Sequence, residues 1–383
     1  MVCSVPPCLA PHRAGVRGGG PADCGPWQEK SMRIVVAMSG GVDSSVAAAL
    51  LAEQGHDVIG LSMQLYDQRG DQTFGSCCTL DDLYDARRVA DAIGIPHYIL
   101  NFERQFRDTV ISNFVREYAA GRTPLPCAHC NSDLKFATLL DRARGLGAEQ
   151  VATGHYARVE QSADGRWLLR RSADPAKDQS YFLFSLTQAQ LERASFPVGA
   201  LTKPEVRAQA RRLGLDVAEK PDSQEICFVP GGDYAAFVAR QAPAVARAGA
   251  IVAQGGEVLG SHGGVHQFTV GQRKGLGISG PAPLYVLKIE AESGQVTVGP
   301  RHALDQTTLT ASGVNWVARD APSSWLPVSA QIRHRHHPAP GRVRAIDADR
   351  AEFVFDEPQP AITPGQAVVF YDDDLVAGGG WID

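Results

Sequence analysis

The chain of 383 residues has no apolar run near the length needed to span a membrane, and 21% of its residues are charged. These features argue against both a membrane protein and a disordered chain. A net charge of -5 argues against a uniformly basic nucleic-acid binder, although local patches can still bind phosphate. The eight cysteines lack the dense, even spacing of a small secreted scaffold, which indicates a reducing cytoplasm.

Residues 1–31 have no apolar core of the kind found in a secretion signal, and they contain several prolines and a run of three glycines. A strand is predicted to begin directly at Met32. We therefore expect residues 1–31 to be a disordered extension or an artefact of the choice of start site.

The central motif is Ser-Gly-Gly-Val-Asp-Ser at residues 39–44, between a short β-branched run and a helix rich in alanine and leucine. Its glycines let the backbone approach an anion, and the N–H groups of the following helix start point toward that anion. The Gly-Lys-Ser/Thr of a Walker loop and the three-glycine dinucleotide spacing are both absent. Asp43 beside a phosphate requires a metal ion between them, so we infer a nucleotide with Mg²⁺. The alternative is a serine–glycine turn without a ligand.

The order of predicted elements gives the fold class. Strands and helices alternate over residues 32–155, which predicts an α/β fold with a doubly wound parallel sheet that binds ligands beyond the carboxyl ends of its strands. A hairpin, two helices and a loop over 156–230 predict a small mixed α+β domain, with 178–230 packing near the first domain. Turns and short alternating strands over 231–383 predict an antiparallel β-barrel.

Three further stretches carry candidate chemistry. Cys127 and Cys130 follow a loop stiffened by two prolines, and a helix capped by Asn131 or Ser132 would place Cys130 at a helix N-terminus, which favours the thiolate. Cys227 ends a second polar loop. The stretch 321–346 contains no acidic residue and is the basic patch of the barrel; the alternative is a strand edge guarded by charges.

The loop at 39–44 resembles the pyrophosphate loop (PP-loop) of the ATP pyrophosphatase superfamily, with its adenine nucleotide α-hydrolase-like fold. From Met32 to the C-terminus the chain resembles the tRNA-specific 2-thiouridylase family, which replaces the C2 oxygen of the wobble uridine in the tRNA anticodon stem-loop by sulfur. Besides the loop, the matching stretches are 77–78, 85–90, 130, 152–156, 177–181, 222–227, 271–277 and 363–366.

The resemblance implies an ATP- and Mg²⁺-dependent sulfurtransferase whose partners are tRNA and a persulfide donor of a cysteine desulfurase relay, with no membrane. Cys227 would carry the persulfide, and Cys130 would release its sulfur and end disulfide-bonded to Cys227. The implied nucleotide contacts are Ala37, Met38, Ser39, Gly40, Gly41, Val42, Asp43, Ser44, Met63 and Gly154. The implied RNA and base contacts are Leu125, Pro126, Cys127, His155, Lys177, Asp178, Gln179, Arg333, His334 and Gln366.

One departure from the family keeps an alternative open. Some members have a carboxylate where this chain has Cys127, so no general base is carried over. Cys127, Cys130 and Cys227 would suffice for an iron–sulfur cluster that presents sulfide to the activated base. A zinc site lacks an evident fourth ligand. A second alternative is a PP-loop ligase that uses ammonia or an amine, but such an enzyme would have no use for the paired cysteines. A third is an RNA-binding protein with a decayed nucleotide site, which does not explain the intact loop.

Overall fold

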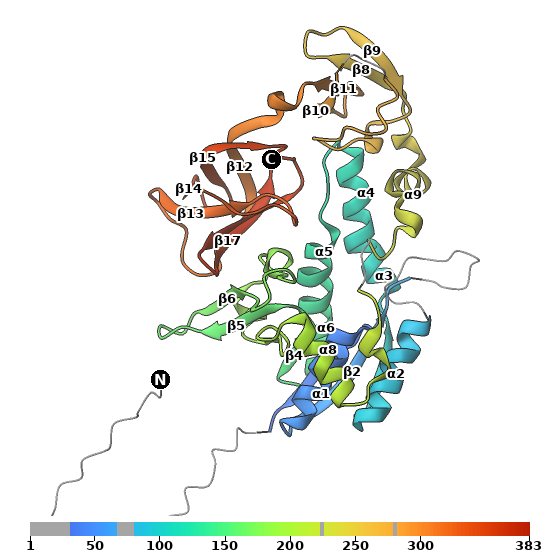
Figure 1. Ribbon diagram of the computed structural model, residues 1–383, viewed down its shortest axis with the longest axis vertical. Helices are drawn as coiled ribbons and strands as arrows, with labels where there is room; N and C mark the ends of the chain where they lie inside the picture. Colours follow the sequence, from blue (N-terminus) through green and yellow to red (C-terminus); the bar gives the residue numbers. More distant parts are fainter. Residues whose placement is uncertain (1–30, 67–79, 223–225, 279–281) are drawn as a thin grey trace, which may run out of the picture. The chain divides into compact units, whose positions relative to one another are not determined.

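Figure 1 shows the computed structural model of the chain, which describes residues 31–66, 80–222, 226–278 and 282–383. The expected N-terminal extension, apart from Ser31, and the adjacent pair Cys77 and Cys78 lie outside the described residues. No helix among the described residues is both long and apolar enough to cross a membrane.

A five-stranded sheet with strand order β3-β2-β1-β4-β7 forms the first part of the fold, and all its pairings are parallel. Its strands are β1 (Arg33–Ala37), β2 (Asp57–Gln64), β3 (His97–Asn101), β4 (Gln150–Thr153) and β7 (Ala194–Ser195). The strand order reverses at β1, so the switch point lies at the carboxyl ends of β1 and β4. The predicted α/β fold is confirmed.

Helices cover both faces of this sheet. Ile34 and Val36 of β1 are buried in one cluster with side chains of α1 (Val42–Glu53), α2 (Leu80–Ile93) and α8 (Lys203–Arg212). Val35, between them, is buried in a second cluster on the other face. This alternation is what a strand buried on both faces requires.

Two longer helices supply much of the second cluster, and each contains a π-helical segment. One runs through α3 (Glu103–Phe106), Arg107–Ile111 and α4 (Ser112–Ala119). The other runs through α5 (Pro126–His129), Cys130–Thr138 and α6 (Leu139–Gly145). Such bulges are often found at functional sites.

The start of the second long helix differs from the prediction. It begins at Pro126, directly after Leu125, because the fixed φ of proline suits the first helical position and its missing N–H is not needed there. Asn131 therefore lies inside the helix and does not cap it. The prediction that Cys130 lies at a helix N-terminus is wrong: Cys127 occupies the first turn, and Cys130 lies one turn further in.

Residues 156–230 are shared between two sheets. The predicted hairpin, β5 (Ala157–Gln161) with β6 (Trp167–Arg171), extends the C-terminal sheet through the pairing of Arg170 with Leu375, whereas β7 joins the parallel sheet. The helices of this segment are α7 (Gln188–Leu191) and α8. How the chain divides into domains stays a prediction.

After residue 231 the chain forms α9 (Tyr234–Gln241) and two sheets (Figure 1). The first has its own core and contains β8 (Gly249–Ala253), β9 (Val258–His262), β10 (Tyr285–Glu290) and β11 (Gln295–Gly299). The second contains β12 (Asp305–Asn315), β13 (Leu326–Gln331), β14 (Ala339–Ala345), β15 (Ala351–Pro360), β16 (Ala367–Asp372) and β17 (Leu375–Ile382). Antiparallel pairing of β12 with β17 closes the second sheet, which confirms the predicted barrel. Short 3₁₀ helices span Ser180–Phe182, Asp216–Glu219, Pro230–Gly232, Pro243–Val245, Val265–Gln267 and Arg301–Leu304.

Candidate active site

The loop between β1 and α1 has the geometry of an anion cradle. Gly40 has a φ of +74°, and a Cβ there would lie 2.1 Å from the backbone carbonyl oxygen of Asp82. Gly41 is the N-cap of α1 and has no side chain to satisfy the first amides of the helix. The hydroxyl oxygens of Ser39 and Ser44 lie 3.2 Å apart beside these amides. The amides of the helix start and the hydroxyls of Ser39 and Ser44 thus lie together at the positive end of a helix dipole.

The residues predicted to contact adenosine lie at the same edge of the sheet. Ala37 ends β1, and the N–H of Met38 donates to the carbonyl of Leu61 on β2 at 2.8 Å. Met63 is buried near the end of β2. Gly154 directly follows β4 and packs on the start of α1, where a Cβ would lie 2.5 Å from the amide nitrogen of Ser44.

We expect Gly154→Ala to lower the free energy of unfolding by about 1–3 kcal/mol, because the new methyl group overlaps backbone that cannot move independently of the loop. Gly145→Ala in α6 is the control, since its Cβ meets nothing within 4 Å and alanine favours a helix. Urea denaturation measures both variants. Equal stability of the Gly154 variant and the wild-type protein would show that the loop does not pack as described.

Asp43, the acidic residue of the loop, is held in a partly buried charge network. Its carboxylate accepts hydrogen bonds from the Tyr156 hydroxyl at 2.8 Å and from the Lys203 ammonium at 2.8 and 2.9 Å. Lys203 also pairs with Asp222 at 2.7 Å, and Asp222 pairs with Lys177 at 2.6 Å. Burial, and then the negative charge of Asp43, raise the pKa of Tyr156, so its hydroxyl remains a donor. Asp43 thus already has a cationic partner, which a metal ion would have to replace.

No sequence pattern pointed directly to Lys203, although it is the central cation of this network. Its side chain is only 10% exposed. A usable signal does exist: Lys203 lies in the first turn of α8, where the helix dipole disfavours a positive charge unless an acidic partner is near.

The two candidate catalytic cysteines contact the same hydrophobic cluster. Cys130 and Cys227 are both partly buried and both pack against the cluster that contains Phe106 and Phe114. Phe228, beside Cys227, makes edge contacts with the rings of Phe106 and Phe114 at 5.4 and 5.1 Å. Both thiols therefore pack against one hydrophobic cluster, whereas the exposed Cys127 lies in the first turn of α5.

Among the described residues, no group of three or more histidine, cysteine, aspartate or glutamate side chains is arranged to hold a metal ion. Cys127, Cys130 and Cys227 therefore do not form a cluster site in this structure. Residues 223–225, which precede Cys227, lie outside the described part of the chain.

The motif Lys177–Asp178–Gln179 and His155 lie beside the phosphate loop, largely bound to the protein itself. The carboxylate of Asp178 accepts hydrogen bonds from the backbone N–H of Ser172 and the hydroxyl of Ser180. Gln179 accepts from the N–H of Tyr156 at 3.0 Å. Burial, and then the positive charge of Lys135, hold the pKa of His155 well below its usual value, so the imidazole is neutral near pH 7. Of these residues, Asp178 and Gln179 order the backbone around the site.

The barrel contacts the loop that leads to the cysteine helix. Gln366 donates to the carbonyls of Thr123 and Pro124 at 3.1 and 3.2 Å, and the N–H of Thr123 donates to the carbonyl of Pro364 at 2.8 Å. Leu125 and Pro126, which follow, are buried. His334 packs on Phe182 with ring centroids 4.7 Å apart, and the carbonyl of Phe182 accepts from Asn131, the neighbour of Cys130. Predicted RNA contacts on the barrel thus lie next to the cysteine helix.

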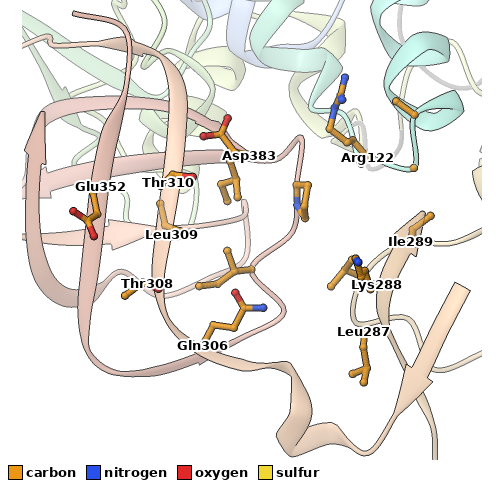
Figure 2. A pocket seen from close by; sticks show the side chains of 16 residues that line it. Arg122, Leu287, Lys288, Ile289, Gln306, Thr308, Leu309, Thr310, Glu352 and Asp383 are labelled. Carbon is orange, nitrogen blue, oxygen red and sulfur yellow. The ribbon is translucent and has the colours of Figure 1, made fainter. Parts of the chain in front are cut away.

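Two cavities lie where this loop meets the C-terminal sheets. One, of about 380 Å³, is lined by Arg333 and Gln366 together with Arg301, Tyr285 and Thr123. The other, of about 520 Å³, is shown in Figure 2, and Arg122, Lys288 and Gln306 are among the residues that line it. None of the predicted site residues lines the larger cavity.

The parallel sheet, the anion cradle at its switch point and the closed C-terminal barrel define a protein of the PP-loop class with an appended β-barrel. Family models match residues 32–231 (tRNA methyl transferase HUP domain), 235–300 (tRNA methyl transferase PRC-barrel domain) and 306–382 (aminomethyltransferase beta-barrel domain). The chain is 56% identical over 360 residues to the tRNA-specific 2-thiouridylase MnmA of Geotalea uraniireducens, covering 92% of this chain and 96% of that protein. It is 55% identical over 356 residues to the protein of that name from Geobacter metallireducens, with the same coverage. The chain belongs to the tRNA-specific 2-thiouridylase family.

A solved 4-thiouridine synthetase–RNA complex with bound ATP is a more distant match. It shares 14% identity at a TM-score of 0.34 and covers 55% of this chain and 50% of that one, so it carries no argument about function.

Proposed function

We propose that this protein replaces the C2 oxygen of the wobble uridine in tRNA by sulfur, using ATP to activate the base and a cysteine persulfide as the sulfur source. The observation that carries the proposal is the combination of an anion cradle at Gly40 and Gly41 with two thiols that pack against one hydrophobic cluster. Family membership over nearly the whole chain after Met32 supports it.

The first step makes a leaving group of the C2 oxygen. The uracil O2 attacks the α-phosphorus of ATP, pyrophosphate leaves, and N3 gives up its proton. The amides at the start of α1 and the hydroxyls of Ser39 and Ser44 bind the phosphates, because donors already fixed in place stabilise developing charge well. Mg²⁺, when bound, would shield the triphosphate, and Asp43 is the carboxylate of the loop that would hold it in exchange for the Lys203 ammonium.

The second step delivers sulfur. An external persulfide donor loads Cys227, and the Cys130 thiolate attacks the Cys227 sulfur and displaces the outer atom as hydrosulfide. Hydrosulfide adds at C2, AMP leaves with the former O2, and the hydrosulfide proton passes to N3. The sulfane sulfur gains the two electrons that the two thiols lose on forming the Cys130–Cys227 disulfide, and an external thiol reductant then restores them.

We assign the remaining predicted residues to binding. Leu125, Pro126 and Cys127 line the site of the flipped-out base, since an enzyme reaches C2 only after the base leaves the stack. Lys177, Arg333 and His334 contact RNA directly, with His155 as a neutral hydrogen-bonding group. Asp178, Gln179 and Gln366 act by holding the backbone beside them, because their side chains already bond to the protein.

Thiolation of a tRNA transcript by anaerobically purified protein tests the proposal. The protein is scanned for iron and then incubated with Mg·ATP and sulfide or a persulfide donor. We expect 2-thiouridine at the wobble position, detected by mass spectrometry of nucleosides, with one pyrophosphate released per sulfur. Release of pyrophosphate with ammonia as co-substrate, and no thiolated product, would instead indicate a ligase of the same superfamily.

Arg333→Gln is expected to weaken tRNA binding and to reduce the salt dependence of log Kd by about 0.9, the value for one lost phosphate contact. Arg333 is half-buried and lines the smaller cavity. One of its guanidinium N–H groups donates to the carbonyl of Pro360, and the other N–H groups of the guanidinium can donate to a phosphate. Arg350→Gln is the control, because Arg350 is exposed and pairs with Asp347 elsewhere on the barrel. If affinity and salt slope both stay unchanged, the basic stretch at 321–346 is only a solvated edge.

A further inference from the structure

Two side chains of opposite charge that precede Cys227 link the chain to the phosphate loop. Lys220 bonds to the loop directly, and Asp222 is linked to it through Lys203. Lys220 donates to the carbonyl of Gly40 at 3.0 Å and to the carboxylates of Asp82 and Asp85, both at 2.6 Å. Two residues later, Asp222 pairs with Lys203, which holds Asp43 of the same loop. Only Pro221 separates the two attachments, and its fixed φ leaves little freedom between them.

The attachment made by Lys220 involves two carboxylates that are largely buried. The side chains of Asp82 and Asp85 are 8% and 15% exposed, so their charges need a partner. Burial lowers the pKa of Lys220, but its hydrogen bonds to Asp82 and Asp85 outweigh burial and leave that pKa raised, so the ammonium stays charged. Arg207 of α8 adds a hydrogen bond to the backbone carbonyl of Lys220 at 3.0 Å.

The other end of the segment is fixed by packing. Phe228 is 2% exposed and contacts the rings of Phe106, Phe114 and Phe237. Cys227 therefore lies next to an aromatic anchor, five residues after a charged anchor at Asp222. The length of chain between the two anchors limits how far Cys227 can move from the loop.

We propose that Lys220 and Asp222 are positioning residues that limit how far Cys227 can lie from the phosphate loop. Neither side chain needs to touch the reacting atoms. Their effect is to keep the sulfur carrier close to the place where the loop presents the activated base, which is an effect mainly on kcat. The link to sulfur transfer rests on the proposed function, whereas the attachment itself does not.

Alkylation of Cys227 by iodoacetamide, followed by peptide mass spectrometry without nucleotide, tests the attachment. We expect Lys220→Met and Asp222→Asn each to raise the alkylation rate of Cys227 about fivefold, because Cys227 is then held less firmly near the loop, and to leave that of Cys127 unchanged. Glu219→Gln is the matched control: it removes an exposed ion pair with Arg211 from the neighbouring position without touching the loop. Lys220→Arg should restore much of the protection.

Steady-state thiolation provides the second measurement. We expect kcat to fall about tenfold or more in Lys220→Met and Asp222→Asn, while KM for ATP changes less than about threefold. Circular dichroism and thermal melts show whether each variant folds. If one of the two variants does not fold, the alkylation rate and kcat of the other test the proposal. Wild-type alkylation rates in both folded variants would overturn the proposal. If the wild-type protein forms no 2-thiouridine, the proposed function fails, and the alkylation rates still decide the attachment.

Discussion

Cys130→Ser and Cys227→Ser are expected to lower thiolation of tRNA by about 10³-fold or more, because a persulfide relay loses either its attacking thiolate or its sulfur carrier. Cys127→Ala and Cys127→Asp are expected to stay within about tenfold of the wild-type rate. Both relay thiols pack against one hydrophobic cluster, whereas Cys127 is exposed in the first turn of α5. Single-turnover formation of 2-thiouridine measures all four variants.

The fate of labelled sulfur separates the relay from an iron–sulfur cluster. Sulfur supplied as a labelled persulfide should remain on Cys227 in the Cys130→Ser variant, since its release partner is missing. A cluster needs all three thiols as ligands. An iron-containing protein that every one of the three substitutions inactivates, including Cys127→Ala, would overturn the relay.

Asp43→Ala is expected to abolish ATP-dependent pyrophosphate release while the protein stays folded. The substitution removes the carboxylate proposed to hold Mg²⁺, and an unshielded triphosphate resists attack at phosphorus. Lys203 keeps Asp222 as a partner, whereas the hydroxyl of the buried Tyr156 loses its acceptor, so we expect a stability loss of about 1–3 kcal/mol. A pyrophosphate assay and a urea titration measure the two effects.

Asp57→Ala is the control for this variant, because Asp57 is an exposed carboxylate at the start of β2 that pairs with Arg33. It should release pyrophosphate at the wild-type rate. Undiminished turnover of Asp43→Ala would show that the nucleotide binds away from this loop.

Local patterns predicted those parts of the fold that depend on neighbouring residues. The β-branched run before Ser39 and the glycines after it define a strand, a loop and a helix start, and the structure has all three. The hairpin, which the structure has at 157–171, was also predicted from local sequence. In each case the determining residues lie within a few positions of each other.

Contacts between distant segments were not predictable from such patterns. Lys203 and Asp43 are 160 positions apart, and Lys220 and Gly40 are 180 apart. The helix start at Pro126 was missed because Asn131 and Ser132 are good cap residues and compete with proline as a start signal. The π-helical segment at Cys130–Thr138, which keeps Cys130 within a continuous helix, has no sequence pattern of its own.

The most direct test of the account follows one oxygen atom. An anticodon stem-loop synthesised with oxygen-18 at C2 of the wobble uridine is thiolated in a single turnover with Mg·ATP and a persulfide donor. Because activation attaches this oxygen to the α-phosphorus, the account predicts one oxygen-18 atom in AMP, none in pyrophosphate, and one AMP for each 2-thiouridine formed. Oxygen-18 in water or pyrophosphate, with unlabelled AMP, would contradict adenylation of the base and with it the central role given to the phosphate loop.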